Sequence, residues 1–257
     1  MTNNQNRRNK ITNRLLSWLD VLAIAAWGIL MLKYWLTNKL NLLIHPNFFG
    51  LVIAAALCLL IISIFRAKEL LQLSRREANT NVQHITLFPP GWGSTFLLTS
   101  AILGFMITPQ VFASDKALQR DLSELLGSTR VKPQAFRAAV PPEERSLVDW
   151  VRMLNVYPEP DRYQGNKVKV QGFVIHPPQL GKEHLLLARF VLTCCAADAY
   201  PVGLPVKLSE TREQYPPDTW LEVEGQMATE TLAGKRQLTI VANSLKKIPQ
   251  PKNPYSY

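Results

Sequence analysis

The chain has 257 residues, of which 47% are hydrophobic and 19% are charged, and this composition excludes an intrinsically disordered protein. The net charge is +10, but residues 1–112 hold 10 Lys and Arg against 3 Asp and Glu, whereas residues 113–257 hold 19 against 16. The basic excess therefore accompanies the apolar part of the chain, which argues for a membrane protein and against a nucleic-acid-binding domain. Three cysteines are too few for a disulfide scaffold.

A basic cytoplasmic tail is predicted for residues 1–14, followed by a transmembrane region of three helices over residues 15–112. The predicted spans are 15–36, 48–65 and 92–112, and the last two contain no charged residue. A helix over 15–36 is about 33 Å long, enough for a bilayer core of about 30 Å. Aromatic residues cluster near the ends of these runs, as is typical of membrane interfaces. A signal peptide is the alternative for the first run, and buried core helices are the alternative for all three.

The basic residues beside the spans predict their orientation. The tail carries four, the loop 33–47 two and the loop 66–91 four, and basic flanks stay in the cytoplasm. We therefore expect a multi-pass protein of the plasma membrane with a cytoplasmic N-terminus, and with everything after Phe112 outside. The basic loop is expected to contact membrane lipid. Val111–Ala113 also resembles a signal-peptidase site, so cleavage after Ala113 is an alternative to an ordinary exit from the membrane.

One carboxylate, Asp20, falls inside the first predicted span. An acidic residue at that depth suggests a proton or cation relay, or a contact with a partner helix. The alternative is an interfacial residue that reaches Arg14 or the lipid headgroups.

Residues 113–162 are predicted to form a helical connector interrupted by prolines. Ser114 can cap a helix whose apolar face contains Leu118, Leu122 and Leu125. A second helix is predicted over 146–155, with Trp150 as a packing anchor, and the Pro158–Pro160 segment should end it.

From residue 163 to residue 257 the hydrophobic period changes to two, which predicts a β domain with a C-terminal tail. Glycines at 172 and 225 are expected to bend the strands, and residues 209–214 could supply a helical turn between the third and fourth strands. The predicted fold class is thus membrane α plus soluble β, in which three N-terminal transmembrane helices precede a small five-stranded barrel resembling the oligonucleotide/oligosaccharide-binding (OB) fold. The five predicted strands are 167–175, 184–193, 200–208, 218–228 and 238–248.

Cys194, Cys195 and Asp198 form the sharpest cluster of chemically active side chains. Two thiols and a carboxylate can contribute to a site for Zn²⁺ or Cu⁺, and His176 and His184 could complete it. Adjacent residues of a strand point to opposite faces, so both thiols can bind one ion only if the chain turns there. Three alternatives stay open: a buried packing cysteine, a turn capped by Asp198, and a redox-active thiol pair.

Four segments carry a resemblance to a known family. The chain resembles the YcgQ-type family of bacterial membrane proteins in Gly165–Phe173, Arg189–Ala199, Trp220–Gly225 and Pro251–Tyr257, together with its three apolar N-terminal runs. The resemblance implies a subunit of a two-component permease whose partner is a larger multi-span membrane protein.

The function expected from these features is that of a non-enzymatic accessory subunit of a membrane permease. Its β domain would recognise substrate or hold the complex together. The first alternative is a membrane-anchored metal- or thiol-binding sensor or chaperone that uses Cys194, Cys195 and Asp198. The second is an enzyme with the same cysteines as catalytic groups. We predict no catalytic residue and no nucleic-acid partner, and zinc is the candidate cofactor.

Overall fold

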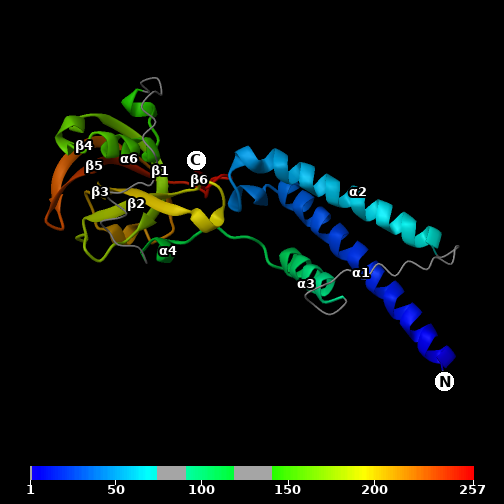
Figure 1. The fold of residues 1–257 in the computed structure, drawn as a ribbon. Helices are drawn as coiled ribbons and strands as arrows, with labels where there is room; N and C mark the ends of the chain where they lie inside the picture. Colours follow the sequence, from blue (N-terminus) through cyan, green and yellow to red (C-terminus); the bar gives the residue numbers. More distant parts are fainter. Residues whose placement is uncertain (1, 74–90, 119–140) are drawn as a thin grey trace. The chain divides into compact units, whose positions relative to one another are not determined.

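The computed structural model describes residues 2–73, 91–118 and 141–257 (Figure 1). The chain forms two compact units, a helical unit over Met1–Gln110 and a β unit over Val111–Tyr257.

Two long helices and one short helix form the helical unit. They are α1 (Thr2–Leu36), α2 (Phe49–Leu73) and α3 (Trp92–Met106), with the 3₁₀ turns η1 (Lys39–Leu42) and η2 (Pro46–Phe48) between α1 and α2. Two segments, Arg14–Leu36 and Pro46–Gln72, are long and apolar enough to cross a membrane. The segment predicted as a tail is helical and continues into α1, and α2 continues past Phe65 into the basic segment.

Small residues let α1 and α2 pack closely. A Cβ on Gly28 would lie 2.9 Å from Leu60 Cγ and 3.1 Å from the carbonyl oxygen of Ala56. The Ser63 hydroxyl donates a hydrogen bond to the carbonyl of Val21 at 3.2 Å. Close backbone approach and interhelical hydrogen bonds of this kind are typical of helices that associate in lipid.

Of the three predicted spans, the structure has two as helices long enough to cross a membrane, and the third run forms a shorter helix. Its helix, α3, ends at Met106 after 15 residues, so it is about 22 Å long and shorter than a bilayer core. The physical reason is Pro109, which disfavours helical geometry at Thr108 and lacks the N–H that would continue the helix. Ile107 is already extended, with φ −89° and ψ 114°.

Hydrogen bonds from α1 to α3 show that the two helices run in parallel. Trp27 Nε1 donates to the carbonyl of Leu97 at 2.9 Å, and Lys33 Nζ donates to that of Phe105 at 3.2 Å. The Tyr34 hydroxyl donates to the carbonyl of Gly104 at 2.5 Å. Residues further along α1 thus contact residues further along α3, as expected for parallel helices. The last carbonyls of α3 also receive hydrogen-bond donors that their own helix cannot supply.

In the β unit, short helices precede the strands. They are α4 (Ser114–Leu118), η3 (Pro142–Glu144), α6 (Leu147–Val156) and η4 (Pro160–Tyr163). The predicted second helix is confirmed as α6, and it begins with a capping box in which Ser146 and Asp149 exchange hydrogen bonds of 3.2 Å. Ser114 begins α4, whereas Leu122 and Leu125 lie outside the described residues.

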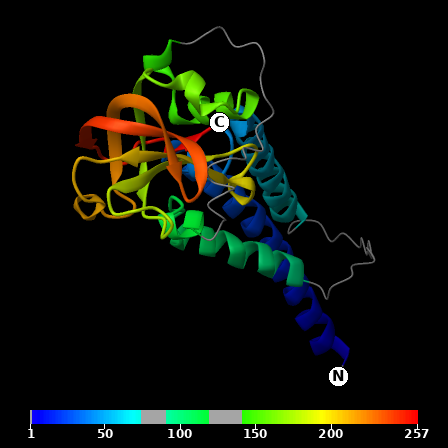
Figure 2. The ribbon, with the colours of Figure 1, turned by 90° about the vertical axis from the view of Figure 1, so that its left-hand side faces the viewer.

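Six strands form one sheet in the β unit (Figure 2). Their pairings run β1–β4–β5–β3–β2 and return from β2 to β1, so that the five long strands form a closed ring of pairings. All five predicted strands are confirmed, and the predicted turn before β4 is the 3₁₀ turn η6 (Arg212–Gln214). The strands are β1 (Lys167–Ile175), β2 (His184–Val191), β3 (Tyr200–Lys207), β4 (Trp220–Leu232), β5 (Lys235–Lys247) and β6 (Tyr255–Ser256).

Both glycine bends occur where predicted, and both have a steric cause. A Cβ on Gly172 would lie 2.6 Å from the carbonyl oxygen of Ala188, at the point where β1 turns from β4 towards β2. A Cβ on Gly225 would lie 2.1 Å from the carbonyl oxygen of Val241, at an irregularity in the β4–β5 pairing. Only glycine allows these backbone approaches.

Strands β4 and β5 are longer than predicted and form a hairpin arm, defined here as residues 229–238. A two-residue turn, Ala233-Gly234, joins them, and both of its residues have positive φ, 48° and 76°. This is the turn geometry whose twist suits a hairpin. The predicted strands 218–228 and 238–248 do not include residues 229–237, most of which are polar.

Inside the ring, alternate residues of the strands form one apolar core with α6. Trp150 of α6 is fully buried and packs edge-to-face on Tyr163, so its prediction as a packing anchor is confirmed. Leu147 and Val151 of the same helix belong to this core. The helix therefore covers the apolar interior of the ring with its own buried side.

Candidate functional site

The two adjacent cysteines lie in the turn between β2 and β3, beside the 3₁₀ turn η5 (Ala196–Asp198). Cys194 is exposed and Cys195 is half-buried. The Asp198 carboxylate accepts hydrogen bonds from the backbone N–H groups of Thr193, at 3.2 Å, and Cys194, at 2.7 Å. Asp198 thus caps the turn, which is one of the alternatives that the sequence left open.

The surroundings of Cys194 disfavour its thiolate. A hydrogen bond with Cys195 raises the pKa of the Cys194 thiol, and desolvation and the nearby Asp198 charge raise it further. Metal binding and nucleophilic attack both require the deprotonated sulfur. The surroundings of Cys194 therefore oppose both reactions at this thiol.

The two histidines proposed as further ligands are engaged elsewhere. His176 Nε2 lies 2.9 Å from the carbonyl oxygen of Tyr215, and burial lowers the pKa of this imidazole. His184 Nε2 lies 2.9 Å from a carboxylate oxygen of Glu230. Within residues 2–73, 91–118 and 141–257, no three His, Cys, Asp or Glu side chains gather as a metal site would need. Zinc binding at Cys194, Cys195 and Asp198 stays a prediction.

Asp20 lies on α1 and faces α3. Its carboxylate accepts a hydrogen bond from the hydroxyl of Ser94. The structure thus shows Asp20 in contact with another helix of the helical unit.

A buried histidine organises a charged group that we call the His184 cluster, consisting of His184, Glu230 and Lys207. The His184 side chain is only 5% exposed, and the two oxygens of Glu230 contact His184 Nε2 at 2.9 Å and Lys207 Nζ at 2.6 Å. Burial alone would raise the pKa of Glu230, but the hydrogen bonds from Lys207 and His184 outweigh it and hold this pKa below its usual value.

The His184 cluster connects β4 to β2 and β3, two paired strands with which β4 shares no backbone pairing. Glu230 belongs to β4, whereas His184 and Lys207 belong to β2 and β3. Since β4 pairs only with β1 and β5, this contact ties the hairpin arm to the opposite part of the ring through side chains. Glu230 lies directly across from Gln237 of β5, so it also fixes that segment of the arm.

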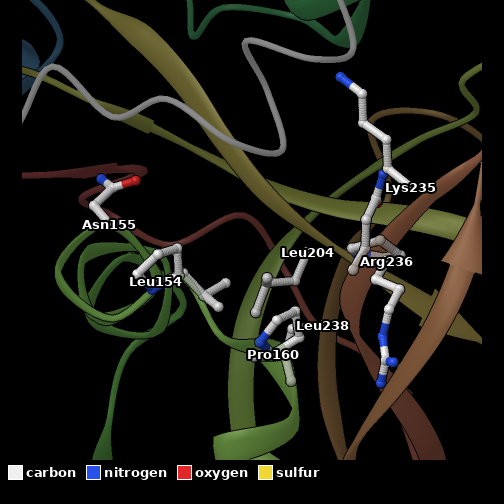
Figure 3. A pocket seen from close by; sticks show the side chains of 10 residues that line it. Leu154, Asn155, Pro160, Leu204, Lys235, Arg236 and Leu238 are labelled. Carbon is white, nitrogen blue, oxygen red and sulfur yellow. The ribbon is translucent and has the colours of Figure 1, made fainter.

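The arm forms one wall of a cavity of about 210 Å³ (Figure 3). The other walls come from α6 with the segment that follows it, and from β3. Most of the lining is apolar, and the close-up shows Leu204, Leu238 and Pro160 gathered between α6 and the strands. The lining residues are Leu154, Asn155, Pro158, Pro160, Leu204, Pro205, Lys235, Arg236, Gln237 and Leu238.

Four polar side chains interrupt this apolar lining, and two of them are cations. Arg236 is neutralised by Asp161, whose carboxylate oxygens both lie 2.6 Å from its guanidinium. Lys235 has no ion-pair partner in the part of the chain that the structure describes. Asn155 Nδ2 and Gln237 Oε1 are buried and find no hydrogen-bond partner among the described residues. None of the lining residues is acidic, and Lys235 is the one lining cation without an ion-pair partner among the described residues.

The C-terminal tail, which contributes to the family resemblance, has a structural role. Strand β6 pairs in parallel with β2, and the Tyr255 side chain is 2% exposed among the aromatic rings of Phe112 and Phe190. Arg152 Nη2 donates to the carbonyl of Tyr257 at 2.8 Å, and Arg189 Nη2 donates to that of Asn253 at 3.0 Å. These contacts hold the tail beside β2, where β6 is the last strand in the sheet order.

Comparison with known protein families gives one match, and it lies in the β unit. Residues 144–257 match the model of the DUF1980 C-terminal domain. This match is consistent with the resemblance to YcgQ-type proteins in the part of the chain where the most specific segments lie. Comparisons with curated proteins and with solved structures gave no match.

Sequence reasoning missed the cavity and the His184 cluster. Their residues come from four distant places in the chain: 154–160, His184, 204–207 and 230–238. The pairings of β3 with β2 and with β5 bring the three strand segments together. One usable signal was present: Lys235 and Arg236 follow a two-residue turn sequence, and charged residues at a hairpin tip are exposed to partners.

Proposed function

We propose that the chain is a membrane-anchored, non-enzymatic accessory subunit of a permease, whose β unit recognises a substrate outside the cytoplasm. The observation that carries the proposal is the pairing of an apolar helical unit with a β unit that contains a cavity. α1 and α2 bury only 22% and 11% of their most apolar stretches. The apolar side chains left exposed need lipid or another membrane protein around them.

A partner is suggested by one face of α2. Leu57, Ile61 and Ile64 lie on one side of this helix at helical spacing, and they are 49%, 51% and 55% exposed. A larger multi-span subunit is the partner that the family resemblance implies, and we assign this face to it.

The location of the β unit outside the cytoplasm depends on α3. The basic residues beside the spans support a cytoplasmic N-terminus, and α3 runs parallel to α1. The end of α3 therefore lies on the side where α1 ends. Donors from Lys33 and Tyr34 to its last carbonyls meet the requirement that backbone groups within lipid be hydrogen-bonded. We propose that α3 and the uncharged residues after it complete a short third crossing.

The ring of pairings supports an OB-type barrel for the β unit. The order β1–β2–β3–β5–β4–β1, with β3 and β5 parallel, suits a five-stranded barrel of this type, and a helical turn precedes β4. Barrels of this kind commonly bind ligands, so the architecture favours recognition rather than a purely structural role.

Two measurements test the proposal. A C-terminal reporter that is active only in the cytoplasm should stay silent when fused after Tyr257, and activity would place the β unit inside. A photo-crosslinking residue at Ile61 should give a discrete adduct with a larger membrane protein, whereas the same residue at exposed Lys167 of the β unit serves as the control. Adducts with lipid alone at Ile61 would contradict the accessory role.

The alternative of a metal- or thiol-binding sensor retains one observation in its favour, the proximity of the two thiols. Metal analysis of the reduced full-length protein after dialysis against Zn²⁺ tests it. Bound zinc that is lost on Cys195→Ser substitution would favour the sensor. Absence of bound zinc would leave the thiols as residues of a capped turn.

A further inference from the structure

We propose that the cavity beside the hairpin arm binds a small organic anion, a carboxylic acid with a short apolar body. This inference rests on the proposed recognition role of the β unit, and it names the chemical class that the unit would recognise. It concerns binding by this chain alone, so it is tested without any partner.

The charge of the lining selects for an anion. Lys235 borders the cavity, and its exposed side chain extends outward from the rim, away from Leu204 and Leu238 (Figure 3). It has no ion-pair partner among the described residues, while the charge of Arg236 is already matched by Asp161. A carboxylate is a natural counterion for this ammonium group. Glu159 and Asp161 flank the lining residue Pro160, but neither lines the cavity, and Asp161 is paired with Arg236. Glu230 is held by His184 and Lys207 and does not line the cavity either.

The apolar lining selects for a ligand with a hydrocarbon part. Three leucines and three prolines form most of the wall, and burying an apolar group against them gains about 25 cal/mol per Å². A bare inorganic ion would lose its hydration here without that compensation. The volume of about 210 Å³ is below the 300 Å³ at which drug-sized sites begin, which limits the ligand to a small molecule.

The two amide side chains supply a further means of recognition. Asn155 Nδ2 and Gln237 Oε1 are a donor and an acceptor without partners in the described part of the chain. A buried polar atom left unpaired costs free energy, and a ligand that pairs with it recovers that cost. Both atoms are buried, so the side chains must rotate to meet a ligand, and Gln237 would then give up the hydrogen bond from its Nε2 to the carbonyl of Leu232. Asn155 could donate to a carboxylate oxygen, and Gln237 could accept from a hydroxyl or N–H group of the ligand.

The His184 cluster keeps the site formed before binding. Glu230 lies across from Gln237 in the arm, and its bonds to His184 and Lys207 hold the arm against the rest of the ring. A preformed wall lowers the entropy lost on binding. The cluster is therefore a positioning group, and it makes no contact with the proposed ligand.

The test uses the full chain in nanodiscs of neutral phosphatidylcholine, with empty nanodiscs as background. Equilibrium dialysis with radiolabelled butyrate and hexanoate should show saturable binding above background. Hexylamine, which has a similar body and the opposite charge, and inorganic phosphate should show none. Equal binding of hexylamine and hexanoate would overturn the charge argument, and phosphate binding at least as strong as that of hexanoate would overturn the apolar one.

A pair of lysine variants locates the site. Lys235→Met removes the charge from an exposed side chain, so folding should be retained and the affinity for hexanoate should fall about tenfold. Lys167→Met, at an exposed lysine of β1 away from the cavity, should leave the affinity unchanged. No saturable binding by the wild-type chain, or equal affinity in Lys235→Met, would overturn the proposal. Either result would leave the topology and partner tests of the accessory role unaffected.

Discussion

The helical unit and the β unit differ in how far they bury their apolar side chains. In the β unit, the inward residues of five strands and α6 are buried almost completely, as Val174, Leu187 and Ile240 at 0% exposure show. In the helical unit, residues such as Leu51 and Phe65 are 70% and 62% exposed. The β unit thus contains its own core, whereas the helical unit leaves large apolar side chains exposed.

The two units also differ in how they use hydrogen bonds. The β unit satisfies its backbone through the ring of strand pairings and reserves side chains for the turn at Asp198 and for the His184 cluster. The helical unit uses side chains of α1 as donors to carbonyls of α3. We infer that the β unit is stable by its own packing and that the helices depend on a few specific contacts and on lipid.

The largest expected effect is a loss of stability of the β unit when a single glycine is replaced. Gly225→Val would place a Cβ 2.1 Å from the carbonyl oxygen of Val241, which backbone movement alone can relieve. We expect the free energy of unfolding of the β unit to fall by about 3 kcal/mol. Hydrogen exchange of β5 amides in the full chain in detergent measures this loss, and exchange in α2 should not change.

Gly181→Val is the matched control, because a Cβ at Gly181 has no heavy atom within 4 Å. Equal losses at both positions would show that the close approach at Gly225 does not set the strand geometry.

A second glycine tests the helical unit in the same way. Gly28→Ile brings side-chain atoms against Leu60 and the backbone of Ala56, so α1 and α2 should separate at a cost of about 2 kcal/mol. The measurement is the resistance of the tertiary fold to added sodium dodecyl sulfate, followed by near-ultraviolet circular dichroism. Protection of β5 amides should remain.

The control for this substitution is Gly50→Ile in α2, where a Cβ meets open space. A loss at Gly50 as large as that at Gly28 would indicate a general effect of bulk in the helices rather than close packing of α1 on α2.

The difference in burial between the units also explains which helices and strands could be predicted from the sequence. Strands β1 to β5 were predicted because alternate residues face one core, and α6 because its cap and apolar face are local features. Residues 229–237 of the arm were missed because they are half-buried or exposed and lie outside that core. The end of α3 was misplaced because composition remains apolar past Met106 while Pro109 prevents the helix from continuing.

For the site, sequence proximity was a weaker guide than strand pairing. Cys194, Cys195 and Asp198 are close in sequence, and they form a capped turn. His184 was named as a metal ligand, but β-sheet geometry places it beside Glu230 and Lys207. The cavity could not be predicted, because its walls come together only when β3 pairs with β5 and α6 packs across them.

A smaller effect concerns pH and the His184 cluster. The pKa of Glu230 lies below its usual value of 4.5 in the folded chain, so its contribution to stability is present above that pH and is lost as the pH falls through the lower, folded-state pKa. Glu230→Gln should cost about 1.5 kcal/mol at pH 7 and less under strongly acidic conditions. Calorimetry of the β-unit transition at several pH values measures the difference.

Glu224→Gln is the comparison for the pH measurement. Glu224 also contacts a lysine, Lys169, at 2.7 Å, but both side chains are about half exposed, so this pair should contribute little at any pH. A difference between wild type and Glu230→Gln that stays constant down to strongly acidic pH would contradict the role of the ionised carboxylate.

The smallest expected effect is a gain in stability of the β unit from a substitution at the tip of the arm. Ala233 adopts φ 48°, a left-handed conformation that costs about 1 kcal/mol for alanine, and Gly234 follows at φ 76°. Asn tolerates this conformation better, and Asn-Gly is the preferred sequence for such a turn, so Ala233→Asn should stabilise the hairpin by about 0.5 kcal/mol. Gly234→Ala, the opposite change in the same turn, should destabilise it.

The arm carries Lys235 and Gln237, so a more rigid turn should also slow the exchange of their amides without altering the helical unit. If Ala233→Asn lowered the stability instead, the two-residue turn would not be the element that sets the register of β4 and β5, and the bulge at Gly225 would be the stronger determinant.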